Sequence, residues 1–419
     1  MNNSNIKLYS HINNNAHQFC IGIYIKAGCL YEPDEINGIT HLFEHIVFRN
    51  IKSKFSRDFY ETLTEKGLYF DASTYKEFLC FSISGLPMGM PLALEILSYL
   101  FDDISISREE FETEKKRVKA EIREGAEKNT LAYLANKEVW NGTSLTNTIL
   151  GSCKTIDSIS IKKLNDYKNT VFNKENVFVY LTGNINSEQY KTIENTVSRI
   201  NISQSNLIND NNTKHPLNFY NRNLTVVKKN APYFRIKICF DVNNSICSEE
   251  VRDILYSILF EEENALVFQE ISENNPYVYS YNSTFEQYSN ISVLDLEYEV
   301  SKKNFENSLT AIIKVFNRIK SGDFNFEINL QKLLTKWELM QDNICDLNWC
   351  LAYENHILCN NIINYNKNKF GRFENLTKKQ VVESAKNIFK TSNLTLALKG
   401  NKTYLDSIDF NYLFKDLDT

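Results

Sequence analysis

The sequence predicts an α+β fold built from two homologous α/β sandwich domains that arose by internal duplication. Three observations predict it: the length, a repeated segment, and strand patterns that alternate with long helical patterns. The 419 residues exceed one ordinary core and suit two domains of about 200 residues each. A composition of 42% hydrophobic and 24% charged residues is typical of a folded globular chain.

Two segments repeat one another at an offset of 217 residues. Thr170 to Asn184 reads TVFNKENVFVYLTGN, and Asn387 to Asn401 reads NIFKTSNLTLALKGN. Each is an apolar run with strand composition that is closed by a Gly-Asn turn. At the same offset, the alternating apolar residues from Phe19 to Ile25 match those from Ile236 to Val242, as expected for strands with one buried face. The two halves therefore look like copies of one fold.

A polar, asparagine-rich stretch separates the two copies, from Asn201 to Pro216. It has no periodicity, which indicates a linker. We therefore expect one domain at residues 1–203 and a second at residues 217–419. Each half also contains long helical patterns, which supports a sandwich of sheet and helices. These patterns cover Met88 to Phe101, Arg108 to Lys128 and Lys302 to Lys320.

Composition and charge exclude several classes of protein. The net charge is -5, which does not favour nucleic acid as a partner, because phosphate binding needs a concentrated basic surface. No window approaches 18 uninterrupted apolar residues, so no membrane span is expected. Met1 to Ser10 lacks the pattern of a secretory signal, so a cytoplasmic location is expected. Nine cysteines without C-x-x-C spacing make a disulfide framework or a four-cysteine zinc site a poor interpretation.

One helical pattern carries residues that can hold a metal. Gly38 to Asn50 reads GITHLFEHIVFRN, and its apolar residues form a stripe that faces a core. His41, Glu44 and His45 project from the other side. Histidines at positions i and i+4 lie about 6 Å apart on one helix face, so both imidazoles can reach one ion. Zn²⁺ favours nitrogen ligands of this kind and needs a third protein ligand. The motif is H-x-x-E-H, the inverted form of the usual zinc-protease motif.

The third ligand has to come from another segment. The helical pattern from Arg108 to Lys128 has a narrow apolar stripe, with Glu114 and Glu121 seven residues apart beside it. Carboxylates at the edge of a buried face can enter a site, although most glutamates on such a charged helix are solvated. Spacing alone does not separate Glu121 from Glu114 or Glu124.

With these motifs, the sequence resembles the family of pitrilysin, insulysin and the mitochondrial processing peptidases, which are inverted-zincin metallopeptidases. Ala27 to Phe48 is similar to the family's segment around the H-x-x-E-H motif. Glu114 and Glu121 match the family's pair of glutamates. The resemblance implies zinc held by His41, His45 and Glu121, with Glu114 supporting the site. It also implies the family's fold.

A strand of the first half resembles the family's Asn-Ala-x-Thr strand, which pairs with the backbone of the substrate. It reads FDASTYKEFLCF from Phe70 to Phe81, with Asp71 at the usual asparagine position. The resemblance therefore implies substrate binding by Asp71, Ala72 and Thr74, through strand addition.

The second half resembles the family's second domain at Leu266 to Tyr279, LVFQEISENNPYVY. Family members carry an arginine and a tyrosine seven residues apart here, which contact substrate. Tyr279 is present, but Ser272 occupies the arginine position. The offset of 217 maps the H-x-x-E-H motif onto Ile258 to Glu262, which lacks both histidines. We therefore expect one Zn²⁺ for each chain, held by the first domain.

This ligand set predicts a zinc-dependent endopeptidase that cleaves peptides or unfolded segments. Glu44 is not needed as a ligand and is expected to be the general base. Tyr279 is expected to donate a hydrogen bond to the developing oxyanion. In bacteria, paired small members of the family often accompany peptide maturation, so the resemblance implies the trimming of leaders from ribosomally made peptides as one substrate class. The alternatives are a non-catalytic scaffolding or substrate-binding subunit of a peptidase complex and a metal hydrolase that acts on something other than a peptide.

The length also predicts an assembly. Family members build a chamber from four such domains, and this chain supplies two. A dimer is expected, either of identical chains or with a related partner. Ser272 favours a heterodimer in which the partner supplies the arginine and tyrosine pair.

Overall fold

The computed structural model describes residues 6–125, 130–200, 202, 224–244, 246–288, 291–353 and 369–418. The chain divides into two compact units, each with its own hydrophobic core. The predicted linker lies outside the described residues except for Ile202, so the domain limits 1–203 and 217–419 stay predictions. Unit 1 contains Met1–Glu127, Gly142–Lys214 and Leu339–Tyr353, and unit 2 contains Lys128–Asn141, His215–Glu338 and Glu354–Thr419.

Unit 1 is built on a five-stranded sheet in the order β1-β5-β2-β4-β3. β1 pairs with β5 in parallel, and the other neighbouring strands are antiparallel. β3 is an edge strand of this sheet. The strands are β1 (Lys7–Ile12), β2 (Phe19–Lys26), β3 (Leu68–Thr74), β4 (Phe78–Gly85) and β5 (Val177–Gly183).

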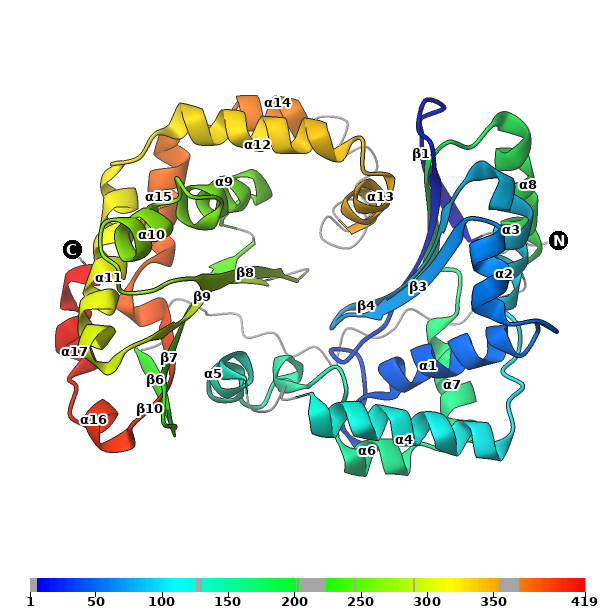
Figure 1. Cartoon of the computed structure of the whole chain (residues 1–419), viewed down its shortest axis with the longest axis horizontal. Helices are drawn as coiled ribbons and strands as arrows, with labels where there is room; N and C mark the ends of the chain where they lie inside the picture. The colour runs from blue at the N-terminus through cyan, green and yellow to red at the C-terminus, as the bar shows by residue number, and fades with distance from the viewer. Residues whose placement is uncertain are drawn as a thin grey trace. The chain divides into compact units, whose positions relative to one another are not determined.

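The helices of unit 1 gather mainly on one face of this sheet (Figure 1). The reason is the period-2 alternation of β2, whose Ile21, Ile23 and Ile25 are fully buried in the same core as the apolar side of α1. The helices are α1 (Ile39–Lys52), α2 (Phe59–Glu65), α3 (Met90–Tyr99), α4 (Arg108–Glu124), α6 (Cys153–Ser158), α7 (Ile161–Val171), α8 (Ser187–Arg199) and α13 (Ile344–Ala352).

Unit 2 repeats this topology, with strands in the order β6-β10-β7-β9-β8. The predicted α+β fold of two homologous domains is therefore confirmed. Its strands are β6 (Thr225–Asn230), β7 (Phe234–Asn243), β8 (Tyr281–Gln287), β9 (Ile291–Val300) and β10 (Leu394–Gly400). Its helices are α5 (Leu131–Val139), α9 (Glu249–Phe260), α10 (Leu266–Phe268), α11 (Phe305–Ser321), α12 (Phe326–Met340), α14 (Lys369–Glu374), α15 (Lys378–Ile388), α16 (Lys402–Asp406) and α17 (Phe410–Leu413).

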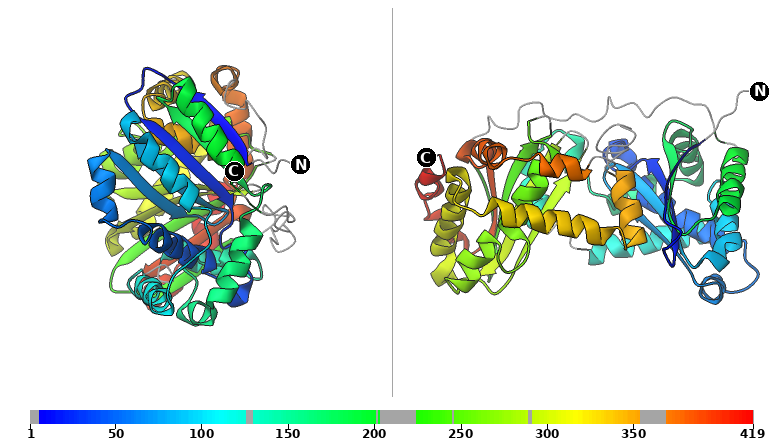
Figure 2. Two further views of the ribbon diagram at one scale, coloured as in Figure 1. Left: turned by 90° about the vertical axis from the view of Figure 1, so that its right-hand side faces the viewer. Right: turned by 90° about the horizontal axis from the view of Figure 1, so that it is seen from above.

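Each unit contains one helix that comes from the other half of the sequence. α13 packs on β2 and β5 of unit 1, on the face opposite to the main group of helices (Figures 1 and 2). α5 packs on β10, β6 and β7 of unit 2. The side chain of Asn348 joins α13 to the sheet: it accepts a hydrogen bond from Tyr24 Oη at 2.8 Å and donates one to the Tyr180 carbonyl at 2.8 Å. The compact units are therefore not two continuous segments of chain.

The structure confirms the 217-residue offset for one strand and corrects it for another. β5 and β10 keep this offset along their whole length. Ile21 of β2 lies opposite Leu181, and Ile236 of β7 lies opposite Leu398. Because Leu398 is the counterpart of Leu181, Ile236 corresponds to Ile21, at an offset of 215. A shift of two residues leaves the buried face unchanged, so the alternating pattern alone could not detect it.

The offset of 217 was also wrong for the helix that carries the H-x-x-E-H motif. α9 ends at Phe260, so Glu261 and Glu262 lie beyond it and cannot correspond to residues inside α1. The buried stripe of α9 matches that of α1 at an offset of 212 instead. The matched buried residues are Ile39, Leu42, Phe43 and Ile46 in α1 and Val251, Ile254, Leu255 and Ile258 in α9.

Candidate metal centre

The first turn of α1 is held by a buried carboxylate. Glu32 is 3% exposed, and it accepts hydrogen bonds from the backbone N–H groups of Gly38 (2.7 Å) and Thr40 (2.9 Å) and from the Asn37 side chain (2.8 Å). Burial raises the pKa of Glu32, and these hydrogen bonds counteract part of the increase. A negative group at a helix N-terminus satisfies free N–H donors and the helix dipole. Glu32 thus fixes the start of the helix that carries both histidines.

α4 supplies the carboxylates. Its N-terminus has a capping box, in which Ser107 and Glu110 bind each other's backbone N–H groups. Phe111 and Val118 are buried in the core of unit 1. This apolar stripe holds α4 against α1, and Glu114 and Glu121 lie beside it. The side chain of Glu114 is only 3% exposed, whereas that of Glu121 is 43% exposed.

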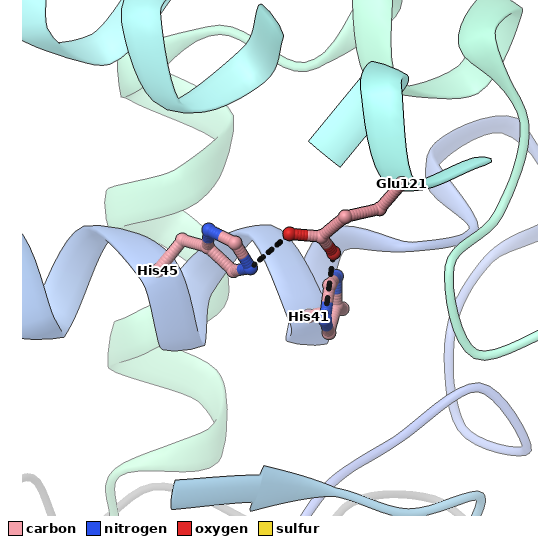
Figure 3. Close-up of side chains that lie close together, drawn as sticks. All are labelled: His41, His45 and Glu121. Carbon is pink, nitrogen blue, oxygen red and sulfur yellow. Dashed lines mark ion pairs between the residues drawn. The ribbon is translucent and has the colours of Figure 1, made fainter. Parts of the chain in front are cut away.

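Side chains of His41, His45 and Glu121 converge between the two helices (Figure 3). Glu121 Oε2 lies 3.6 Å from His41 Nε2, and Glu121 Oε1 lies 3.5 Å from His45 Nε2. One ligand atom from each residue lies within 4.8 Å of the others. A tetrahedral ion with ligand bonds of about 2.0–2.1 Å separates its ligand atoms by about 3.4 Å. Two nitrogens and one oxygen that lie within 4.8 Å of one another are close enough to bind one Zn²⁺ ion.

The protonation preferences of the two histidines differ. Burial, together with the neighbouring His45, lowers the pKa of His41 to about 4. His41 is therefore neutral near pH 7, as a metal ligand must be. Burial also opposes a charge on His45, but its hydrogen bond to Glu114 and the charges of Glu121 and Glu44 outweigh burial and raise the pKa. The carboxylates around His45 thus favour a positive charge at this position.

Glu114 supports the site through His45. Its Oε2 lies 3.5 Å from His45 Nδ1, while Arg49 Nη2 and Arg117 Nη1 lie 2.7 Å and 3.0 Å from its Oε1. Burial works against the charged carboxylate, but the hydrogen bonds from His45 and Arg49 lower the pKa of Glu114 overall. A carboxylate that binds the second ring nitrogen of a histidine fixes the orientation of the ring towards a metal.

Glu44 lies next to this cluster and is not part of it. Thr74 Oγ1 donates a hydrogen bond of 2.5 Å to Glu44 Oε2. Burial raises the pKa of Glu44, against the opposing effects of Thr74 and His45. The carboxylate is thus held by one oxygen, and its proton affinity is higher than that of an exposed glutamate.

The predicted substrate-binding residues lie on the edge strand β3. Asp71 is exposed, and Ala72 and Thr74 are half-buried. In the described residues β3 pairs only with β4, through positions such as Ala72 opposite Phe81. An edge strand presents free N–H and C=O groups to an added strand. Thr74 also has a role that the sequence did not indicate, because its hydroxyl holds Glu44.

Tyr279 is not part of the cluster of unit 1. It lies in unit 2, and it is 96% exposed. Ser272 belongs to the turn of π-helix that follows α10, from Gln269 to Glu273. The predicted role of Tyr279 in stabilising the oxyanion therefore stays a prediction.

The sequence assigned no role to Glu32 or Arg49, although Glu32 lies within the segment Ala27 to Phe48 that resembles the family. Glu32 lies six residues before Gly38, the N-cap of α1. This is too far from the helix start for the usual capping rule, so the local sequence did not indicate its hydrogen bonds to the first turn. Arg49 had no signal of its own, because its partner Glu114 is 65 residues away in the sequence.

Comparison with known proteins agrees with this geometry. Residues 8–152 match the model of the insulinase family, peptidase family M16, and residues 158–328 match the model of the peptidase M16 inactive domain. The chain belongs to peptidase family M16. The description of the second match as an inactive domain agrees with the absence of the motif histidines from the second half.

Two sequence relatives align with the chain over about 170 residues each. It is 30% identical over 176 residues to the uncharacterized zinc protease YmxG of Bacillus subtilis, a match that covers 42% of the chain and 43% of YmxG. It is 27% identical over 172 residues to the β subunit of the human mitochondrial-processing peptidase, covering 40% of the chain and 35% of that subunit. The matched part thus spans less than half of each of these relatives.

A comparison of structures finds similarity over nearly the whole chain. The crystal structure of a protease from Helicobacter pylori superposes with a TM-score of 0.80, covering 96% of this chain and 98% of that one, at 17% sequence identity. Identity at this level shows a shared fold alone. None of the helices in the described part of the chain is long and apolar enough to cross a membrane.

Proposed function

We propose that the chain is a zinc-dependent endopeptidase that cleaves peptides or unfolded segments. The convergence of His41 and His45 with Glu121, which lies 76 residues after His45 on another helix, carries this proposal. Membership of peptidase family M16 and the likeness to YmxG, described as a zinc protease, support it.

Each residue of the site would have its own role in the reaction. His41, His45 and Glu121 would hold Zn²⁺. Bound zinc would polarise the carbonyl of the cleaved bond and increase the acidity of a water molecule. Glu44 would take a proton from that water and deliver it to the departing amine. Thr74 would keep Glu44 in position through its hydrogen bond to Oε2, which leaves Oε1 for the proton.

The substrate would bind to the edge of the sheet. An extended peptide can pair with β3 as an additional strand, with contacts from Asp71, Ala72 and Thr74. Because Thr74 also binds Glu44, this strand would carry the substrate backbone beside the general base. Tyr279 would donate a hydrogen bond to the oxyanion. The trimming of leaders from ribosomally made peptides is one substrate class that this arrangement suits.

We also propose that the chain works as a dimer. The relative in mitochondria is described as the β subunit of its peptidase, and Ser272 removes the family's arginine from this chain. A heterodimer with a related subunit that supplies the arginine and tyrosine pair would complete the site, and a homodimer is the alternative. The cytoplasmic location stays a prediction.

The substitution Glu44→Gln tests the proposal. It keeps the size of the side chain but removes the base, so we expect one bound Zn²⁺ for each chain and a fall in kcat of about a hundredfold or more. Cleavage of unfolded peptides should be measured for the chain alone and with any related partner, with and without a chelator. Undiminished activity in this variant would exclude Glu44 as the base. Zinc-free protein without activity would favour the scaffolding alternative.

A further inference from the structure

An open pocket of about 250 Å³ lies directly beside the candidate metal centre. Glu44 and His45 form part of its lining, so the pocket is continuous with the place where the bond would be cleaved. Three aromatic residues and three basic residues complete the wall together with Glu114. They are Phe48, Phe59, Tyr60, Arg49, Lys52 and Arg117.

Two of the basic residues share one carboxylate. Arg49 and Arg117 both lie within 3.0 Å of Glu114 Oε1. The Glu114 carboxylate also faces His45, and only 3% of its side chain is exposed, so it is already satisfied within the protein. With Lys52 and Glu44, the lining contains three basic side chains and two carboxylates, so its formal net charge is positive.

Lys52 differs from the two arginines, which both bind Glu114. It is the last residue of α1, and its Nζ lies 4.7 Å from the centre of the Tyr60 ring. Within the described part of the chain, no carboxylate lies within ion-pair distance of this ammonium group. A cation over an aromatic ring keeps its N–H donors free for an anion. Lys52 is therefore held at the pocket wall, and the N–H groups of its ammonium can donate hydrogen bonds to an anion in the pocket.

Resting on the proposed function, we infer that this pocket selects an acidic side chain of the substrate, next to the cleaved bond, and that Lys52 determines this specificity. The methylene groups of a glutamate or aspartate would pack against Phe48 and Phe59, and the carboxylate would meet Lys52. A purely apolar side chain would instead cover Lys52 and the arginines without replacing the water bound to them, which is unfavourable. Glu44, the remaining carboxylate of the lining, lies at the metal side of the pocket.

The test uses three peptides that differ only at the residue next to the cleaved bond: Glu, Gln or Lys. Each is made with that residue on either side of the bond, and kcat/KM is measured with the full chain and any partner it requires. For one of the two sides, the wild type is expected to prefer Glu over Gln by about tenfold, as a partly screened charge pair allows.

Two variants of Lys52 and one control separate charge from folding. Lys52→Glu is expected to reverse the order, so that the Lys peptide is cleaved faster than the Glu peptide. Lys52→Met keeps most of the stem and is expected to abolish the preference without reversing it. Lys54→Glu makes the same change of charge two residues further on, outside the pocket lining, and is expected to keep the wild-type preference.

The outcomes distinguish this inference from the function on which it rests. Cleavage of all three peptides at equal rates by the wild type, or a preference for Lys or for apolar residues, would overturn the acidic specificity and leave the peptidase intact. An equal effect of Lys52→Glu and Lys54→Glu would show that overall charge, not the pocket, sets the preference. No cleavage of any peptide, in a chain that contains zinc, would count against the proposed function itself.

Discussion

The two units have the same sheet topology, but among the described residues a side-chain cluster that could hold a metal ion lies in unit 1 alone. The buried stripes of α1 and α9 match at an offset of 212, which aligns His41 with Asp253 and His45 with Ser257. The buried stripes of α4 and α12 match at an offset of 215, with Phe111 and Val118 on Phe326 and Leu333.

This second match aligns Glu121, the proposed third ligand, with a residue of opposite charge. The counterpart of Glu121 is Lys336, whose Nζ lies 2.5 Å from Glu261 Oε1. A lysine at this position would repel a cation instead of binding it. Apolar stripes thus maintain the same fold in both units, whereas three polar positions beside those stripes would decide between a metal centre and an ordinary surface.

The largest effect is expected for Glu121→Ala. It removes one of only three protein ligands, so zinc content should fall from one equivalent to a trace, and peptidase activity should fall to background. Elemental analysis of the purified protein and a peptide assay give the two readouts. Full retention of zinc would mean that another acid, such as Glu124, completes the site.

A smaller effect is expected for Glu114→Gln. The amide cannot provide the charge that orients His45, so zinc affinity should fall by about 10–100-fold without loss of the site. Competition with a chelator of known affinity measures the change. Unaltered affinity would show that Glu114 serves Arg49 and Arg117 and has no part in holding the metal.

The next prediction concerns α13, the helix from the second half of the sequence that packs on the sheet of unit 1, and its contribution to the stability of the protein. Asn348→Leu removes the acceptor of the buried Tyr24 hydroxyl, and an unsatisfied buried donor costs about 1–3 kcal/mol. We expect the free energy of unfolding to fall by about 2 kcal/mol, measured by denaturant titration. Asn195→Leu, on the exposed side of α8, is the control and should change it by less than about 0.5 kcal/mol. Equal effects would mean that α13 is not needed to complete unit 1.

The smallest effect is expected for Lys336→Ala, the counterpart of Glu121→Ala. Its partner interaction is an ion pair in which 55% of the lysine side chain is exposed, and such pairs contribute about 0–1 kcal/mol. Zinc content should stay at one equivalent, and thermal unfolding should hardly change. A loss of zinc in this variant would contradict the assignment of the metal to unit 1 alone.

The fold was largely predictable because alternating strands and amphipathic helices leave regular traces in the sequence. β5 and β10 could be matched residue by residue, since both end in Gly-Asn. The offset of β7 could not be predicted, because a shift of two residues leaves the buried face of a strand unchanged. The offset of α9 was assigned wrongly for another reason: Leu-Phe-Glu occurs both at 42–44 and at 259–261, although a shift of five residues turns a helix face by about 140°. The sequence also did not indicate that α5 belongs to unit 2 and α13 to unit 1. A helix that packs on a strand far away in the sequence has the same apolar periodicity as one that packs on a nearby strand.

The candidate site was predictable where its residues are close in sequence or match a family motif. His41 and His45 follow from spacing on one helix turn. Glu121 could be chosen over its neighbours only through resemblance, because spacing along α4 does not show which carboxylate faces α1. The bond between Thr74 and Glu44 and the charge shared by Arg49 and Glu114 depend on packing between distant segments, and no local pattern encodes them.

The most direct test of the central claim is to locate the metal in crystals of the protein by anomalous X-ray scattering at the zinc edge. The account predicts one strong peak for each chain, about 2.0–2.1 Å from a nitrogen of His41, a nitrogen of His45 and an oxygen of Glu121. A zinc-replete crystal without a peak at this position, or with the peak on other residues, would contradict it.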